Sequence, residues 1–225
     1  MKKLVLAAIA VAVTAGFVFA GEMKVKLGLD TIGSATFIYK ENAGFNYKGD
    51  NNFYIDSEVG VGMALEFLFP IFGIVKIGPG VGYSFERGLK LDGSMKLIND
   101  SYIGYDSYID KQSYSFIPTY LTIEVNPIRS APEVFFKGNI GVNYGTISTK
   151  GTTPAWGSFP AKTYSNSEYH LGFYYGFGAG YNFPSGFFLD ALYSWNSLYE
   201  PEGYMTYSRL AISAGYKFKF SKSVS

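Results

Sequence analysis

Large apolar side chains recur at every second position along eight segments of this 225-residue chain. In residues 169–183 every odd position is aromatic or aliphatic, while most even positions are glycine. Residues 53–69 repeat the pattern, with Gly60, Gly62 and Glu66 among the even positions. A helix would spread the two sets around its circumference, whereas a strand places them on opposite faces. The alternation therefore predicts long β-strands.

The connections between these segments alternate in length, which predicts an up-and-down arrangement. The other predicted strands cover residues 23–39, 74–87, 114–126, 133–145, 187–195 and 204–220. Short connections rich in proline and glycine cover residues 71–73, 127–132 and 184–186, and longer polar ones cover about residues 40–51, 88–113, 146–167 and 197–203. Tight turns at one end and long loops at the other are typical of transmembrane barrels, whose turns face the periplasm.

The bulky set is expected to face outward, because a small barrel has little room inside. A soluble eight-stranded barrel buries its apolar set in the lumen, but aromatic residues alone make up 19% of this chain. In 53–69 the outward set includes Ser57, and in 74–87 the inward set includes Ser84 and Glu86. The predicted fold class is all-β: an eight-stranded antiparallel transmembrane up-and-down β-barrel with short periplasmic turns and longer extracellular loops.

Composition argues against several other kinds of protein. The chain has no cysteine, which excludes disulfides and cysteine-based zinc sites, and its net charge of +1 comes without a basic run that would favour nucleic acid. The glycine runs at 78–82 and 176–180 do not open a helix after a strand, as phosphate-binding loops do. The single histidine, His170, has glycine at the next same-face position, and no serine has an evident base. We therefore expect no enzyme, no cofactor and no metal.

The first 20 residues have the form of a secretory signal peptide. Two lysines follow Met1, residues 4–20 carry no charge, and Val18 and Ala20 are small or apolar residues at positions −3 and −1 of a cleavage point before Gly21. We predict that residues 1–20 are cleaved and that residues 21–225 form the barrel domain. An uncleaved anchor is the alternative, although spanning a membrane takes about 20 apolar residues.

Charged residues on the predicted inner face gather near the periplasmic ends of the strands. Most lie at a similar level, and their signs alternate from the first strand to the fifth, so we predict a layer of cross-strand ion pairs that closes the lower lumen. A charge-lined pore is the alternative. The layer consists of Lys26, Glu66, Lys76, Glu124, Lys137, Asp190 and Lys217, with Lys24 and Lys219 at the same ends.

Two of the predicted extracellular loops carry aromatic residues suited to contact with other molecules. The candidates are Tyr102, Tyr105 and Tyr108 in the first of them, and Trp156 and Phe159 in the second. Tyrosine supplies amphipathic contact area at low entropic cost, and loops on a rigid scaffold are common recognition sites. The first loop also holds several aspartates, but their spacing matches no calcium loop. We expect an extracellular protein or glycan ligand.

Two short stretches resemble a known family. Residues 115–121, with the sequence SFIPTYL, are similar to a recurrent strand start of the small outer-membrane β-barrels of the OmpA, OmpX and opacity-protein group. Tyr216, Phe218 and Phe220 resemble the C-terminal assembly signal of such barrels, although residues 221–225 follow here. The resemblance implies a barrel domain in the bacterial outer membrane, with membrane lipid and the barrel assembly machinery as partners, and a monomer.

The expected function is therefore non-enzymatic: a structural or surface-interaction role, adhesin-like, through the extracellular loops. A narrow porin-like channel for ions or small solutes is the alternative. A barrel-embedded lipid-modifying enzyme is the third reading, disfavoured because His170 lacks a nucleophile and an acid in the right places.

Overall fold

The computed structural model describes residues 21–39, 52–90, 95–98, 106–153, 155, 160–200 and 203–220, and the predicted signal peptide lies outside this part. The strands are β1 (Gly21–Tyr39), β2 (Asn52–Asp56), β3 (Gly60–Phe72), β4 (Val75–Gly88), β5 (Met95–Ile98), β6 (Asp106–Val125), β7 (Val134–Thr153), β8 (Lys162–Asn182), β9 (Phe187–Glu200) and β10 (Gly203–Phe220). The described residues include no helix that could span a membrane.

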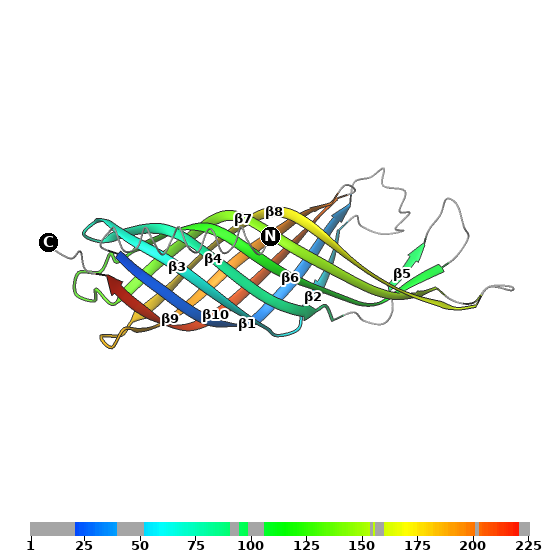
Figure 1. The fold of residues 1–225 in the computed structure, drawn as a ribbon, viewed down its shortest axis with the longest axis horizontal. Coiled ribbons are helices and arrows are strands. Elements are labelled where there is room, and N and C mark those ends of the chain that lie inside the picture. Colours follow the sequence, from blue (N-terminus) through cyan, green and yellow to red (C-terminus); the bar gives the residue numbers. More distant parts are fainter. Residues whose placement is uncertain are drawn as a thin grey trace.

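These strands close into one antiparallel barrel (Figure 1). Each barrel strand pairs with the next along the chain, and β1 pairs with β10 from Gly21–Phe220 to Tyr39–Gly203, which closes the cylinder. Strands β2 and β3 both pair with β1 and occupy one position in the barrel, while β5 pairs with β6 outside the cylinder. The barrel thus has eight strand positions, and the predicted fold class is confirmed.

The alternation along the strands separates an apolar exterior from a polar interior. Leu27, Ile140 and Phe177 on the outside are 63%, 66% and 62% exposed, as side chains in contact with lipid are. The inward residues that precede them, Lys26, Asn139 and Gly176, are buried. Above Tyr144 and Tyr169, whose rings stack at 5.8 Å, the outer face becomes rich in serine and threonine.

The strands continue past this apolar belt, so the predicted loop boundaries are wrong in part. Residues 106–113 and 146–153 belong to β6 and β7, and residues 162–167 belong to β8. Backbone pairing needs no apolar side chains once the strands leave the membrane, and the loss of alternation therefore marks the membrane boundary instead of the end of the strands. In Figure 1 these hairpins extend beyond the barrel at the end that also carries β5.

Two predicted side-chain directions are also wrong, because of irregularities in the ladders. Ser57 lies in the break between β2 and β3 and turns inward, with its hydroxyl 3.1 Å from that of Tyr207. The register of β4 against β6 shifts between Ser84 and Arg87, so that Arg87 is buried while Glu86 is exposed. An extra residue in a strand reverses the faces of all the residues beyond it.

Candidate functional site

Six buried charged side chains form a layer across the lumen near its periplasmic end, which we call the lower ion-pair layer. Its members are Lys24 and Lys26 of β1, Glu66 of β3, Glu124 of β6, Lys137 of β7 and Asp190 of β9. All are inward residues close to the short turns, and the ladders place Lys24 beside Glu66 and Glu124 beside Lys137. The strand register therefore brings opposite charges to one level.

The layer is held by close contacts between nitrogen and oxygen. The shortest are Lys24 Nζ to Glu124 Oε2 at 2.5 Å, Lys137 Nζ to both Glu66 oxygens at 2.8 Å, and Lys26 Nζ to Asp190 Oδ2 at 2.9 Å. Longer contacts link Lys26 to Glu66 at 3.2 Å and Lys137 to Asp190 at 3.4 Å. The Tyr120 hydroxyl donates to Glu66 at 3.0 Å. Each charge in the layer thus has at least one opposite charge beside it.

Of the charged residues that the sequence predicted for this layer, all but one lie in the layer or at its edge. Lys76 joins the edge of the layer, 3.4 Å from Glu124, and also pairs with Glu22 at 2.9 Å. Within the described residues, Lys217 takes part in none of these ion pairs and is half-buried at the periplasmic end of β10. Lys24, which the sequence placed at the same level, has its ammonium 4.0 Å from the centroid of the Phe135 ring.

A second charged group lies higher in the lumen, and the sequence analysis missed it. We call it the upper arginine cluster: Asp30 of β1, Arg87 of β4 and Arg209 of β10, all buried. Arg209 Nη1 is 2.9 Å from Asp30 Oδ2, and the Arg87 guanidinium contacts the same oxygen. Arg209 Nη1 also donates to the Ser84 hydroxyl at 2.5 Å, and Arg87 donates to the Tyr207 hydroxyl at 3.1 Å.

Part of this cluster was accessible to sequence reasoning. Arg209 falls on the predicted inner face of the last strand, and Asp30 continues the inward even positions of the first. The alternation does not predict the inward direction of the Arg87 side chain, because the irregularity in β4 turns this residue inward.

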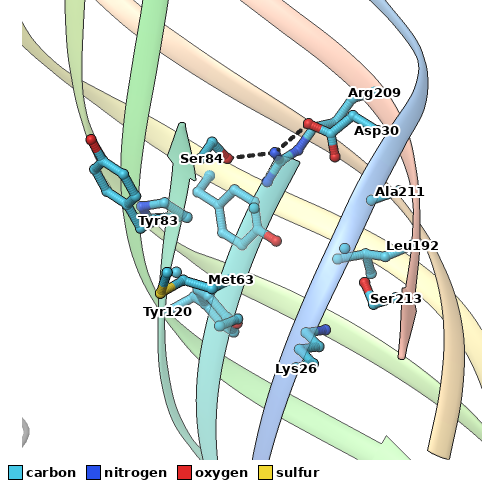
Figure 2. Close-up of a pocket in the computed structure, with 16 residues that line it drawn as sticks. Lys26, Asp30, Met63, Tyr83, Ser84, Tyr120, Leu192, Arg209, Ala211 and Ser213 are labelled. Atoms are coloured by element: carbon cyan, nitrogen blue, oxygen red, sulfur yellow. Dashed lines mark hydrogen bonds and ion pairs between the residues drawn. The ribbon is translucent and has the colours of Figure 1, made fainter. Parts of the chain in front are cut away.

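A small cavity, which we call the central chamber, separates the two charged groups (Figure 2). Its volume is about 40 Å³. Lys26 lines it at the lower end, and Asp30 and Arg209 line it at the upper end. Gly28, Gly62 and Gly82 form part of its wall.

Above the arginine cluster the lumen is filled by apolar and aromatic side chains, which we call the aromatic cap. Its members are Ala35, Leu89, Tyr114, Phe116, Ile147, Leu198, Met205 and Tyr207, and all are buried. The Tyr207 ring lies 4.7 Å from that of Tyr114 and stacks on that of Phe116 at 5.5 Å between centroids. Three layers therefore follow one another along the lumen: ion pairs, arginines and the cap.

The described residues give little support to a catalytic or metal centre. Among them, no group of three or more histidine, cysteine, aspartate or glutamate residues is arranged to hold a metal ion. His170 Nδ1 lies 3.1 Å from the Tyr199 carbonyl oxygen, and its Nε2 lies 3.5 Å from Glu168. Neither contact supplies a nucleophile.

The predicted loop contacts fall mostly beyond the part of the chain that the structure describes. Tyr102, Tyr105, Trp156 and Phe159 lie outside the described residues. Tyr108 lies in β6, where its backbone pairs with Lys96 of β5 and Thr152 of β7.

The predicted assembly signal forms the end of β10. Tyr216, Phe218 and Phe220 pair with Val25, Met23 and Gly21 of β1 at the closing seam. The Tyr216 and Phe218 side chains are exposed on the outer face, and residues 221–225 lie outside the described residues.

Comparison with solved structures finds bacterial proteins, several of them outer membrane proteins, at low sequence identity. Ail of Yersinia pestis, solved in complex with the heparin analogue sucrose octasulfate, is 16% identical, with 89% of this chain and 100% of that chain covered and a TM-score of 0.48. OprG of Pseudomonas aeruginosa is 11% identical, with 89% and 97% covered and a TM-score of 0.49. The outer membrane protease OmpT of Escherichia coli is 12% identical, with 88% and 97% covered and a TM-score of 0.44.

No curated protein matches the chain in sequence. The family model for the outer membrane protein beta-barrel domain, by contrast, matches residues 4–218. This match spans nearly the whole chain and agrees with the closed barrel and its apolar outer belt. The protein lies in the bacterial outer membrane, and the chain belongs to the outer membrane protein beta-barrel domain family.

Proposed function

We propose that this protein is a non-conducting barrel that acts at the cell surface through its extracellular hairpins. The observation that carries the proposal is the filling of the lumen by the lower ion-pair layer, the upper arginine cluster and the aromatic cap. An eight-stranded barrel has an interior only wide enough for side chains to fill. The central chamber, at about 40 Å³, is too small to serve as a continuous passage.

The experiment that tests this proposal is conductance of the refolded protein in a planar bilayer. We expect no discrete current steps from protein that is folded, as judged by heat-modifiable migration on a gel. A channel would give steps, and its ion selectivity would shift when Lys76, at the edge of the lower layer, is changed to Gln. That result would overturn the proposal in favour of the narrow channel.

The surface role rests on the strands that extend beyond the apolar belt. Along β7 and β8, the outer-face residues above the belt include Ser148 and Ser167, whose hydroxyls are 2.9 Å apart, and Lys150. A rigid polar hairpin of this kind suits contact with a protein or glycan. Binding to a panel of host glycoproteins and of neutral and sulfated glycans tests this role, and no binding to any of them would argue against it.

We propose that the protein has no enzymatic activity, since His170 contacts a carbonyl oxygen and Glu168 but no nucleophile among the described residues. Activity against a lipid or peptide substrate that is lost in His170→Ala would contradict this. The exposed aromatics at the end of β10 fit recognition by the barrel assembly machinery, and the apolar belt fits contact with membrane lipid around a monomer.

A further inference from the structure

The charges buried in the lumen do not balance. Within the described residues, the buried cations are Lys24, Lys26, Arg87, Lys137 and Arg209, and the buried carboxylates are Asp30, Glu66, Glu124 and Asp190. The lower ion-pair layer is neutral as a unit, since it has three lysines and three carboxylates, and the pair of Lys76 and Glu22 at its edge is also neutral. The excess positive charge therefore belongs to the upper arginine cluster, where two guanidinium groups share Asp30.

A second buried guanidinium without a matching anion is costly. Arginine does not lose its proton in proteins, so it cannot become neutral as a buried lysine or carboxylate can. Buried charges are normally paired, because the free energy lost when a charge leaves water is far larger than the free energy gained from contacts with neutral groups. The hydroxyls of Ser84, Ser194 and Tyr207 accept hydrogen bonds from the cluster but carry no charge. Arg87 Nε has no partner at all within the described residues.

The central chamber adjoins this excess charge and has the lining of an anion site. Two cations and one carboxylate border the cavity: Arg209 and Asp30 lie at its upper end and Lys26 at its lower end (Figure 2). The hydroxyl-bearing residues Ser84 and Ser213 also line it and supply neutral donors, whereas the Tyr120 hydroxyl beside them already donates to Glu66. A buried water needs roughly 10–15 Å³ of such space, so a cavity of about 40 Å³ holds a monatomic anion with a water or two. A sugar or an organic acid is too large.

We propose that the central chamber binds one halide-sized anion, which compensates the second arginine of the upper cluster. Chloride is the abundant anion of this class. Layers of side chains fill the lumen above and below the chamber, and refolding in the presence of the anion ensures that it reaches the site. The site is independent of any extracellular ligand and of the question of conductance.

Crystallography with bromide in place of chloride tests the site directly. The protein is unfolded, refolded in sodium bromide and crystallised, and anomalous scattering is measured at the bromine absorption edge. We expect one anomalous peak in the chamber, between Arg209 and Lys26. Ordered water without anomalous signal there, or an empty chamber, would overturn the proposal.

A matched pair of variants tests the role of the excess charge. Arg87→Gln removes one buried positive charge from a residue that does not line the chamber. Lys162→Gln removes one exposed positive charge from the start of β8. We expect the bromide peak to be lost in Arg87→Gln and kept in Lys162→Gln. A peak of full occupancy in both variants would show that the anion does not compensate the excess positive charge.

Thermal unfolding provides a second readout that does not depend on crystals. A ligand that binds only the folded state raises Tm, and a salt concentration ten times the Kd of the site corresponds to a gain of roughly 3–6 °C in a domain of this size. We expect chloride or bromide to stabilise the unmodified barrel more than sulfate does at equal ionic strength. Because sulfate generally strengthens folded proteins, the same comparison is made on Arg87→Gln, and an equal difference between chloride and sulfate in the two proteins would count against the site.

Discussion

Glu66 shows at the scale of one residue how a charge is accommodated in this lumen. Its carboxylate receives Lys137 at 2.8 Å on both oxygens, Lys26 at 3.2 Å and the Tyr120 hydroxyl at 3.0 Å. Such an arrangement offsets the cost of burial only while all its members are present, because the loss of one partner leaves the others as uncompensated charges.

Replacement of Glu66 by Gln is therefore expected to destabilise the barrel strongly. The change keeps the shape but removes the charge that faces Lys26 and Lys137, and breaking a buried pair in this way costs about 3–5 kcal/mol. The free energy of unfolding in urea, measured on protein refolded in detergent, checks the effect. Glu168→Gln, at an exposed position of β8, is the control and is expected to lie within about 0.5 kcal/mol of the unmodified protein. Equal stability of both variants would argue against an ion-pair layer.

Glycines on the inner wall make room for large neighbours. A Cβ added to Gly80 would collide with the Tyr120 ring, and one added to Gly215 would collide with that of Phe188. In each case the aromatic residue is the cross-strand partner of the glycine. The glycine pattern that the sequence displays thus serves the packing of the lumen.

Gly80→Ala is expected to destabilise the barrel by about 1–3 kcal/mol, because the added methyl group forces the Tyr120 ring away from Glu66. Gly138→Ala is the matched control, since nothing lies within 4 Å of the added atom on the outer face of β7. The control should be neutral or slightly stabilising, as alanine is better tolerated than glycine in a strand. Urea unfolding compares the two, and an equal loss in both would show that the contact with Tyr120 is unimportant.

At the scale of the strands, the sequence predicts those features of the barrel that follow from the alternation of side chains between two faces. The apolar outside, the polar inside and the lower charged residues all follow from it, because these residues lie in regular stretches of β1, β3, β6, β7 and β9. The period does not predict where a strand breaks or bulges. The inward turns of Ser57 and Arg87 depend on such irregularities, and the place of Arg87 in the upper arginine cluster therefore needed the structure.

The extracellular hairpin of β7 and β8 is expected to be dispensable for folding. Deleting residues 149–166 and joining Ser148 to Ser167 by an Asn-Gly turn keeps Ile147 in the aromatic cap and removes only pairs above the apolar belt. We expect the shortened protein to stay heat-modifiable and to lose at least tenfold in binding to any ligand found for the intact protein.

A control and a contrary outcome accompany this deletion. Reversing residues 155–160 keeps the composition of the tip but changes its order, and this variant separates specific recognition from general stickiness. Failure of the shortened barrel to refold would show that the hairpin belongs to the folding unit, and full retention of binding would place the contact surface elsewhere.

For the whole molecule, closure of the lumen is redundant. The β1–β10 seam makes the wall continuous, and the interior is then filled at three successive levels by unlike chemistry: ion pairs, arginines and aromatic rings. Most contacts lie within one level, and the hydrogen bond from Arg87 to Tyr207 joins the arginine cluster to the cap, so we expect the loss of one level to leave most contacts of the other two in place. Water or ions must pass all three to cross the membrane.

We therefore expect variants that lose one level to remain non-conducting. The double variant Glu66→Ala with Lys137→Ala removes two opposite charges of the lower layer together, and Phe116→Ala with Tyr207→Ala removes two rings of the cap. Both are recorded in planar bilayers after heat-modifiable migration has shown that they are folded, with a general porin as the positive control for insertion. Neither should give discrete current steps, because the arginine cluster and one further level still fill the lumen. Steps in the first variant alone would mean that the lower layer is the seal, and steps in the second alone would assign that role to the cap.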